Sequence, residues 1–213
     1  MREPSGQGKL GGMAQRAAQE VRVALRPYTI PNGITLLRLV LVPLFALAVV
    51  GRNYRWAFAV FILAGLSDAL DGALARWLAA RSLLGTYLDP IADKALLVTA
   101  YIVLTWPAPG VVSIPLWLTV LALSRDVLIV LVALLLYLGA GIREFKPSFL
   151  GKATTVVHIV TVAAVVVANL QPLPEVWLSA LFYAAFALTL LSGLDYLRRA
   201  ALQVEKLHDA RGQ

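Results

Sequence analysis

Residues 114–138 read IPLWLTVLALSRDVLIVLVALLLYL, and this stretch decides the class of fold. It holds 25 residues, and Arg125 and Asp126 are its only charged ones. An α-helix of this length exceeds the hydrocarbon core of a bilayer, which about 20 residues can span. The stretch therefore predicts a transmembrane helix with a pair of charges inside it.

The composition of the whole chain agrees with a membrane protein. Of its 213 residues, 60% are hydrophobic and 15% are charged, whereas an ordinary soluble domain is roughly 45–50% apolar. A water-soluble chain of this length cannot bury so much apolar surface. The chain contains no cysteine, which excludes a disulfide-stapled module and a zinc site held by thiolates.

Six apolar segments follow one another, at residues 34–50, 56–80, 85–106, 114–138, 153–170 and 177–197. The predicted fold is all-α: a polytopic membrane protein with six transmembrane helices, preceded by a short interfacial amphipathic helix. That first helix is expected because apolar residues recur at helical spacing after Met13, with arginines elsewhere on the helix. We divide the chain into a disordered N-terminus, the interfacial helix, the membrane domain and a cytoplasmic tail, at residues 1–12, 13–30, 31–200 and 201–213.

The basic residues outside the apolar segments predict the orientation. Fourteen Lys and Arg residues lie near the termini and the loops on one side, and only Arg52 and Arg55 lie on the other. Positive loops stay in the cytoplasm, so both termini are expected there, in the cytoplasmic (inner) membrane. The net charge of +7 then faces anionic lipid of the bilayer, and no nucleic-acid partner is expected.

Four acidic residues lie in the second and third apolar segments. Asp68 and Asp71 are spaced i, i+3, and Asp89 and Asp93 are spaced i, i+4, so each pair shares one face of a helix. The two segments run antiparallel, which places both pairs toward the cytoplasmic end. We expect the four carboxylates to face one pocket that opens to the cytoplasmic leaflet.

Four ionised carboxylates need cations between them in such a pocket. Oxygen ligands without Cys or a nearby His pair favour Mg²⁺ or Mn²⁺, and two ions would suit a site that binds phosphate. Gly72 and Gly85 would let a ligand approach the backbone, and Arg76 lies one turn beyond Gly72 to bind a phosphate. The alternative for either aspartate pair is a structural or proton-relay role.

Residues 68–93 read DALDGALARWLAARSLLGTYLDPIAD, which matches D-x2-D-G-x2-A-R-x8-G-x3-D-x3-D at every specified position. This signature resembles that of the CDP-alcohol phosphotransferases, membrane enzymes of phospholipid synthesis. Residues 28–43 (YTIPNGITLLRLVLVP) look like the family's entry into its first helix. Six spans is also the family's usual number, so the resemblance covers about residues 28–197.

The resemblance implies a role for each residue of the motif. Asp68, Asp71 and Asp89 would bind the metal ions, and Asp93 would complete the cluster and act as general base. The acceptor hydroxyl would attack the β-phosphorus of CDP-diacylglycerol, and CMP would leave. The CDP moiety would be bound by Gly72, Ala75, Arg76 and Gly85. Members of the family are commonly homodimers, so a homodimer is expected.

The acceptor is indicated by two later segments. Residues 124–127 (SRDV) and 146–158 (KPSFLGKATTVVH) look like the cardiolipin synthases of this family, whose acceptor is phosphatidylglycerol. The short six-span build resembles the phosphatidylglycerophosphate synthases, whose acceptor is glycerol 3-phosphate. We expect an anionic glycerol-type acceptor, with inositol phosphate, serine and choline as other options. Its candidate binding residues are Arg125, Arg143, Lys146 and Lys152.

Each of these basic residues also has a structural interpretation. Arg125 and Asp126 would equally form a buried pair that locks helices, and Arg143 and Lys146 would simply be positive-inside residues. Arg38 either lies near the site or extends to the interface, and His158 is expected to contact a neighbouring helix rather than act as a base.

Two other classes of protein place acids inside membrane helices. An intramembrane prenyltransferase uses paired aspartates but spaces them on two distant motifs. A small ion-coupled transporter would place acids near the midplane and show inverted halves. Here the acids cluster at one end and no repeat is visible, which favours the transferase.

Overall fold

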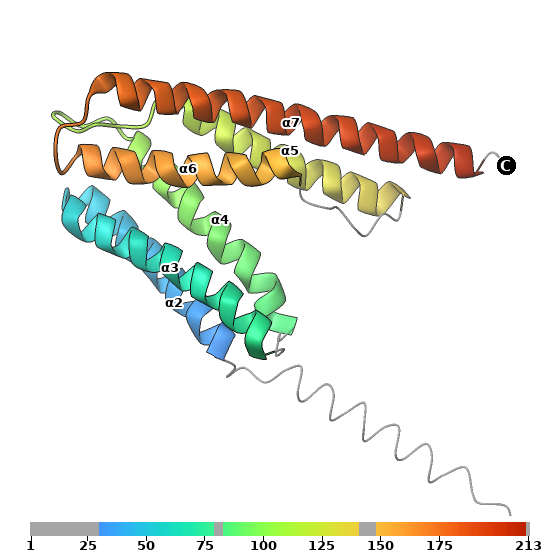
Figure 1. Cartoon of the computed structure of the whole chain (residues 1–213), viewed down its shortest axis with the longest axis horizontal. Coiled ribbons are helices and arrows are strands. Elements are labelled where there is room, and N and C mark those ends of the chain that lie inside the picture. Colours follow the sequence, from blue (N-terminus) through green and yellow to red (C-terminus); the bar gives the residue numbers. More distant parts are fainter. Residues whose placement is uncertain (1–29, 79–82, 141–147, 212–213) are drawn as a thin grey trace, which may run out of the picture. The chain divides into compact units, whose positions relative to one another are not determined.

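The computed structural model describes residues 30–78, 83–140 and 148–211, and this part of the chain is all-helical, without a strand (Figure 1). Its six helices are α2 (Ile30–Val50), α3 (Tyr54–Leu78), α4 (Leu83–Thr105), α5 (Leu116–Ala140), α6 (Phe149–Ala168) and α7 (Glu175–Arg211). The expected disordered start and interfacial helix, at residues 1–12 and 13–30, lie outside the described residues, apart from Ile30, where α2 begins.

Each predicted apolar segment coincides with one helix, and nearly all ends agree within a few residues. The exception is α7, which continues to Arg211 although the apolar segment was expected to end at residue 197. The helix therefore extends through most of the expected cytoplasmic tail, residues 201–213. A helix continues past its apolar part because residues 198–206 contain neither Gly nor Pro.

Three of the described helices are long and apolar enough to cross a membrane, over Leu116–Leu138, Phe149–Ala168 and Glu175–Gln203. In the described parts of α2, α3 and α4 the apolar stretches are shorter. Only 11% of the Leu116–Leu138 window is buried inside the protein. Such a wide apolar surface suits contact with lipid rather than with water.

The chain forms two compact units, which we describe separately. Of the described residues, the first unit contains those up to Leu44 and those from Val60 to Leu96, and the second contains Phe45–Ala59 and those from Leu97 onward. In the first unit Ala64 and Ala92 are buried, and Arg38 is also buried, with only 1% of its surface exposed. Arg38 therefore does not extend to the surface, which excludes the snorkelling interpretation.

The second unit is built around α5, α6 and α7, with α7 lying along both of the other helices (Figure 1). Valines of α6 fill the space between them, and Val162, Val165 and Val166 are fully buried. Trp117 of α5 stacks on Tyr183 of α7, with ring centroids 6.1 Å apart. The small and β-branched side chains let these helices pack closely where they meet.

Two connections of the second unit have well-defined backbone contacts. Arg52, in the turn between α2 and α3, adopts a left-handed conformation with φ 56°, which costs about 1–2 kcal/mol for a residue other than glycine. Asn169, after α6, exchanges two side-chain hydrogen bonds of 2.8 Å with the backbone of Val112. This exchange fixes the loop between α4 and α5 to the end of α6.

Candidate active site

The aspartate motif lies on two consecutive helices. Asp68 and Asp71 are in the second half of α3, and Asp89 and Asp93 are in the first half of α4. Because both helices are continuous over these positions, each pair shares a face of its helix as the spacing predicted. The side chains of the four aspartates lie outside the described residues, as do those of Gly72, Ala75, Arg76 and Gly85.

The donor set of the motif suits a hard divalent cation. Its four carboxylates supply only oxygen, the ligand that Mg²⁺ and Mn²⁺ prefer. Among the residues whose side chains are described, no group of three or more His, Asp or Glu residues is placed to hold a metal. The motif is therefore the candidate metal site of this chain on the chemistry of its residues.

Arg125 is the centre of a polar contact that joins α5, α6 and α7. Its Nη1 donates to Asp126 Oδ1 at 2.9 Å, and its Nη2 donates to Ser192 Oγ of α7 at 2.6 Å. A Cβ at Gly151 of α6 would lie only 3.4 Å from Nη2 and 3.2 Å from Ser148 Oγ. Glycine at 151 therefore lets the backbone of α6 approach the guanidinium closely.

His158 forms a second polar contact, deeper along α6. Its Nδ1 is hydrogen-bonded to the Tyr101 hydroxyl of α4, and its Nε2 lies 2.9 Å from Thr189 Oγ1 of α7. The Thr189 hydroxyl donates to the carbonyl of Ala185 at 2.6 Å. A neutral imidazole protonated on Nε2 satisfies all of these contacts. His158 thus contacts two neighbouring helices, as expected from the sequence.

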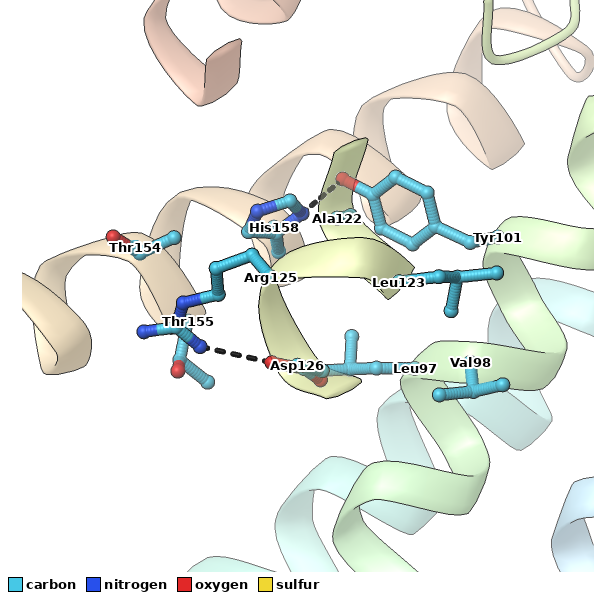
Figure 2. A pocket seen from close by; sticks show the side chains of 10 residues that line it. All are labelled: Leu97, Val98, Tyr101, Ala122, Leu123, Arg125, Asp126, Thr154, Thr155 and His158. Atoms are coloured by element: carbon cyan, nitrogen blue, oxygen red, sulfur yellow. Dashed lines mark hydrogen bonds and ion pairs between the residues drawn. The ribbon is translucent and has the colours of Figure 1, made fainter. Parts of the chain in front are cut away.

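A small cavity separates the two polar contacts (Figure 2). Arg125, Asp126 and His158 line its polar side, and Leu97 and Val98 of α4 line its apolar side. Its volume is about 50 Å³, whereas one water occupies about 30 Å³ in the liquid. The water-accessible space beside Arg125 is therefore about the size of one or two water molecules.

The remaining acceptor candidates lie in different surroundings. Lys152 is exposed on the first turn of α6, whereas Arg143 and Lys146 lie outside the described residues. The structure brings Arg125 together with Ser192, and His158 with Tyr101 and Thr189. The sequence did not point to Ser192, Tyr101 or Thr189. Hydroxyl side chains within apolar helices can indicate contacts between helices. Such residues are common in membrane helices, however, and the sequence does not show which residue each one contacts.

Comparison with known proteins identifies the family. The family model for CDP-alcohol phosphatidyltransferase matches residues 28–191. The match includes the whole aspartate motif and the helices that carry Arg125 and His158. This chain belongs to the CDP-alcohol phosphatidyltransferase family, as the motif at residues 68–93 indicated.

Its relatives carry two kinds of name. It is 36% identical to human cardiolipin synthase (CMP-forming) over 156 residues, which is 65% of this chain and 50% of the human protein. It is 39% identical to the enzyme of the same name from Streptomyces coelicolor over 145 residues, 64% of this chain and 65% of that protein. It is also 36% identical over 204 residues to a probable phosphatidylglycerophosphate synthase of Mycobacterium tuberculosis, which covers 92% of this chain and 89% of that protein. The chain thus spans about half the length of its human relative.

Proposed function

We propose that this protein transfers the phosphatidyl group of CDP-diacylglycerol to a hydroxyl of a glycerol-type acceptor and releases CMP. The observation that carries the proposal is the complete aspartate motif on α3 and α4 within the family match of residues 28–191. The names of two relatives, which describe CMP-forming enzymes, agree with the proposed leaving group.

The membrane domain is proposed to contain all six described helices as spans, with both termini in the cytoplasm. Three helices have the length and composition of spans, and the other three coincide with the remaining apolar segments. The positive residues support an orientation in the inner membrane with the motif near the cytoplasmic leaflet. We also expect a homodimer, which cross-linking in membranes would test.

Mg²⁺ or Mn²⁺, in two sites, is proposed to be held by Asp68, Asp71, Asp89 and Asp93. When bound, such ions neutralise charge on both sides of a diphosphate bond. Gly72, Ala75, Arg76 and Gly85 are proposed to bind the CDP moiety, since two glycines permit close approach and Arg76 pairs with phosphate.

The proposed reaction has one displacement step. The acceptor oxygen forms a bond to the β-phosphorus of CDP-diacylglycerol, and the bond from that phosphorus to the oxygen of CMP breaks. Asp93 takes the proton of the acceptor hydroxyl as general base. CMP leaves with the electron pair of the broken bond, and the phosphatidyl group stays on the acceptor.

The acceptor is proposed to be phosphatidylglycerol, which gives cardiolipin, or glycerol 3-phosphate, which gives phosphatidylglycerophosphate. The cardiolipin synthase relatives support the first, and the Mycobacterium tuberculosis relative, which matches over 92% of this chain, supports the second. Both acceptors are anionic, so Arg125, Arg143, Lys146 and Lys152 are proposed to attract them.

The test is an acceptor screen with the detergent-purified full chain. CDP-diacylglycerol and Mg²⁺ or Mn²⁺ are supplied with phosphatidylglycerol, glycerol 3-phosphate or inositol phosphate, and CMP and lipid products are measured. We expect CMP release with one glycerol-type acceptor, and a rate about 10²–10⁴-fold lower for Asp93→Asn. Release only with inositol phosphate would overturn the acceptor, and no release from folded protein would overturn the proposed activity.

A further inference from the structure

A second cavity of the second unit is larger than the one beside Arg125 and lies elsewhere on the helices. Its volume is about 410 Å³, within the range of ligand pockets, roughly 300–1,000 Å³. It is lined by the end of α2, the turn to α3, the end of α4 and the loop that follows. None of its lining residues belongs to the aspartate motif or to the acceptor candidates.

The lining of this cavity is apolar apart from two side chains. Arg52 is its only charged lining residue, and Tyr54, two positions later in the sequence, contributes a hydroxyl. The rest of the lining consists of aliphatic residues, prolines and Trp106. A strongly polar solute would find few partners here, whereas a hydrocarbon chain with one anionic group would match both parts of the surface.

The predicted topology places this cavity at the outer surface of the membrane. The turn at residues 51–53 and the loop after Thr105 are the connections on the side that carries only Arg52 and Arg55 as basic residues. Trp56 and Trp106 are 65% and 78% exposed near these connections. Exposed tryptophans are typical of the level of the lipid headgroups.

The backbone conformation of Arg52 gives a further reason, independent of the cavity, to assign a role to its side chain. Its φ of 56° is in the region where glycine or asparagine normally ends a helix, and Gly51 is directly before it. The amides of Gly51 and Asn53 donate to the carbonyls of Leu47 and Ala48 at 2.9 and 2.8 Å, so the turn itself is well formed. A strained non-glycine residue at the rim of a cavity points to a role for its side chain.

We propose that this cavity binds an anionic phospholipid of the outer leaflet, with an acyl chain against the apolar lining and the phosphate on Arg52. The guanidinium offers paired donors that suit phosphate oxygens. A zwitterionic lipid would bring its own cation toward Arg52, so an anionic headgroup is preferred. This site is separate from the aspartate motif and does not depend on the acceptor of the proposed reaction.

The experiment counts lipids retained by the detergent-purified full chain in native mass spectrometry. Phosphatidylglycerol and phosphatidylcholine with the same acyl chains are titrated in EDTA, so that metal-dependent lipid binding does not contribute. Arg52→Asn is the main variant, because asparagine tolerates the left-handed turn but removes the charge. We expect it to lose one retained phosphatidylglycerol, with about 10-fold weaker binding, the effect of removing one hydrogen bond to a charged group.

Three comparisons make the result specific. Arg55→Gln is the matched control, because Arg55 is the neighbouring exposed arginine and does not line the cavity; its affinity should stay within about two-fold. Arg52→Lys should recover part of the binding, and Ala108→Trp should block the cavity and lower retention of both lipids. Equal effects of Arg52→Asn and Arg55→Gln, equal binding of the two lipids, or unchanged binding in Ala108→Trp would each overturn the proposal.

Discussion

The aspartate motif and the contacts of Arg125 and His158 are both polar regions of apolar helices, but they are assembled in different ways. The motif lies within residues 68–93, on two consecutive helices. Arg125 meets a serine 67 positions away, and His158 meets partners 57 and 31 positions away. The aspartates of the motif are arranged by helical spacing, whereas the contacts of Arg125 and His158 are arranged by the packing of helices that are distant in the sequence.

This comparison separates two effects of substitution. Changes in the motif should lower turnover and leave the folded state nearly unchanged, because the proposed partners are substrate and cations. Substitutions at the contacts of Arg125 and His158 should mainly lower stability, because these residues bond to other side chains of the protein.

The largest loss of CMP release is expected from substitution of Asp93. Asp93→Asn keeps the size of the side chain but removes the proposed base, so CMP release should fall by about 10²–10⁴-fold. Thermal unfolding followed in detergent should be nearly unchanged. The control is Asp195→Asn on α7, where the carboxylate accepts a hydrogen bond from Arg199 at 2.9 Å and lies far along the chain from the motif. Near-normal turnover of Asp93→Asn would show that another group is the base.

The next largest effect, on the metal concentration needed for activity, is expected from substitution of Asp71. Asp71→Asn removes one of four proposed ligand carboxylates, so the Mg²⁺ concentration for half-maximal activity should rise by at least about 10-fold, as for loss of one charged interaction. A titration of CMP release against Mg²⁺ and Mn²⁺ measures the shift. If the midpoint stays at the wild-type value, Asp71 does not bind the metal.

Variants of Arg125 test whether this residue takes part in binding the acceptor as well as in packing the helices. If Arg125 attracts the acceptor, Arg125→Gln should raise KM for the anionic acceptor by about 10-fold or more, the effect of one charged hydrogen bond. Ser192→Ala removes the partner of Nη2 but leaves the charge, so it should lower thermal stability with at most about a 3-fold change in KM. Equal changes of stability in both variants, with KM unchanged, would make Arg125 a helix-locking residue only.

The smallest effect on turnover is expected at His158. His158→Ala removes the partner of Tyr101 and Thr189, which should cost about 1–3 kcal/mol of stability for buried groups left unpaired. Thr155→Ala is the control for stability, because the Thr155 hydroxyl is exposed and bonds to the carbonyl of Gly151 one turn away, although Thr155 also lines the cavity beside Arg125. Thermal unfolding and CMP release are measured for both. A large loss of turnover without loss of stability would place His158 in the active site.

The sequence predicted much of the fold, for reasons that are local. A run of apolar residues and the breaks between runs located all six described helices, because helix length and bilayer thickness are both fixed. The end of α7 at Arg211 was missed, since the end of an apolar run is not the end of a helix when the following residues also favour one. The pairing of Asp68 with Asp71 and of Asp89 with Asp93 on helix faces followed from the period of 3.6 residues alone.

The sequence by itself determined the class of fold, the family and the motif, because each depends on spacing along one or two helices. Only the tertiary structure decided that Arg125 bonds to Ser192, that Gly151 gives it room, and that Arg52 faces an apolar cavity. Those contacts depend on how each helix is rotated about its axis and packed against distant helices. In a helix that is apolar on every side, the sequence pattern does not show which face meets another helix and which meets lipid.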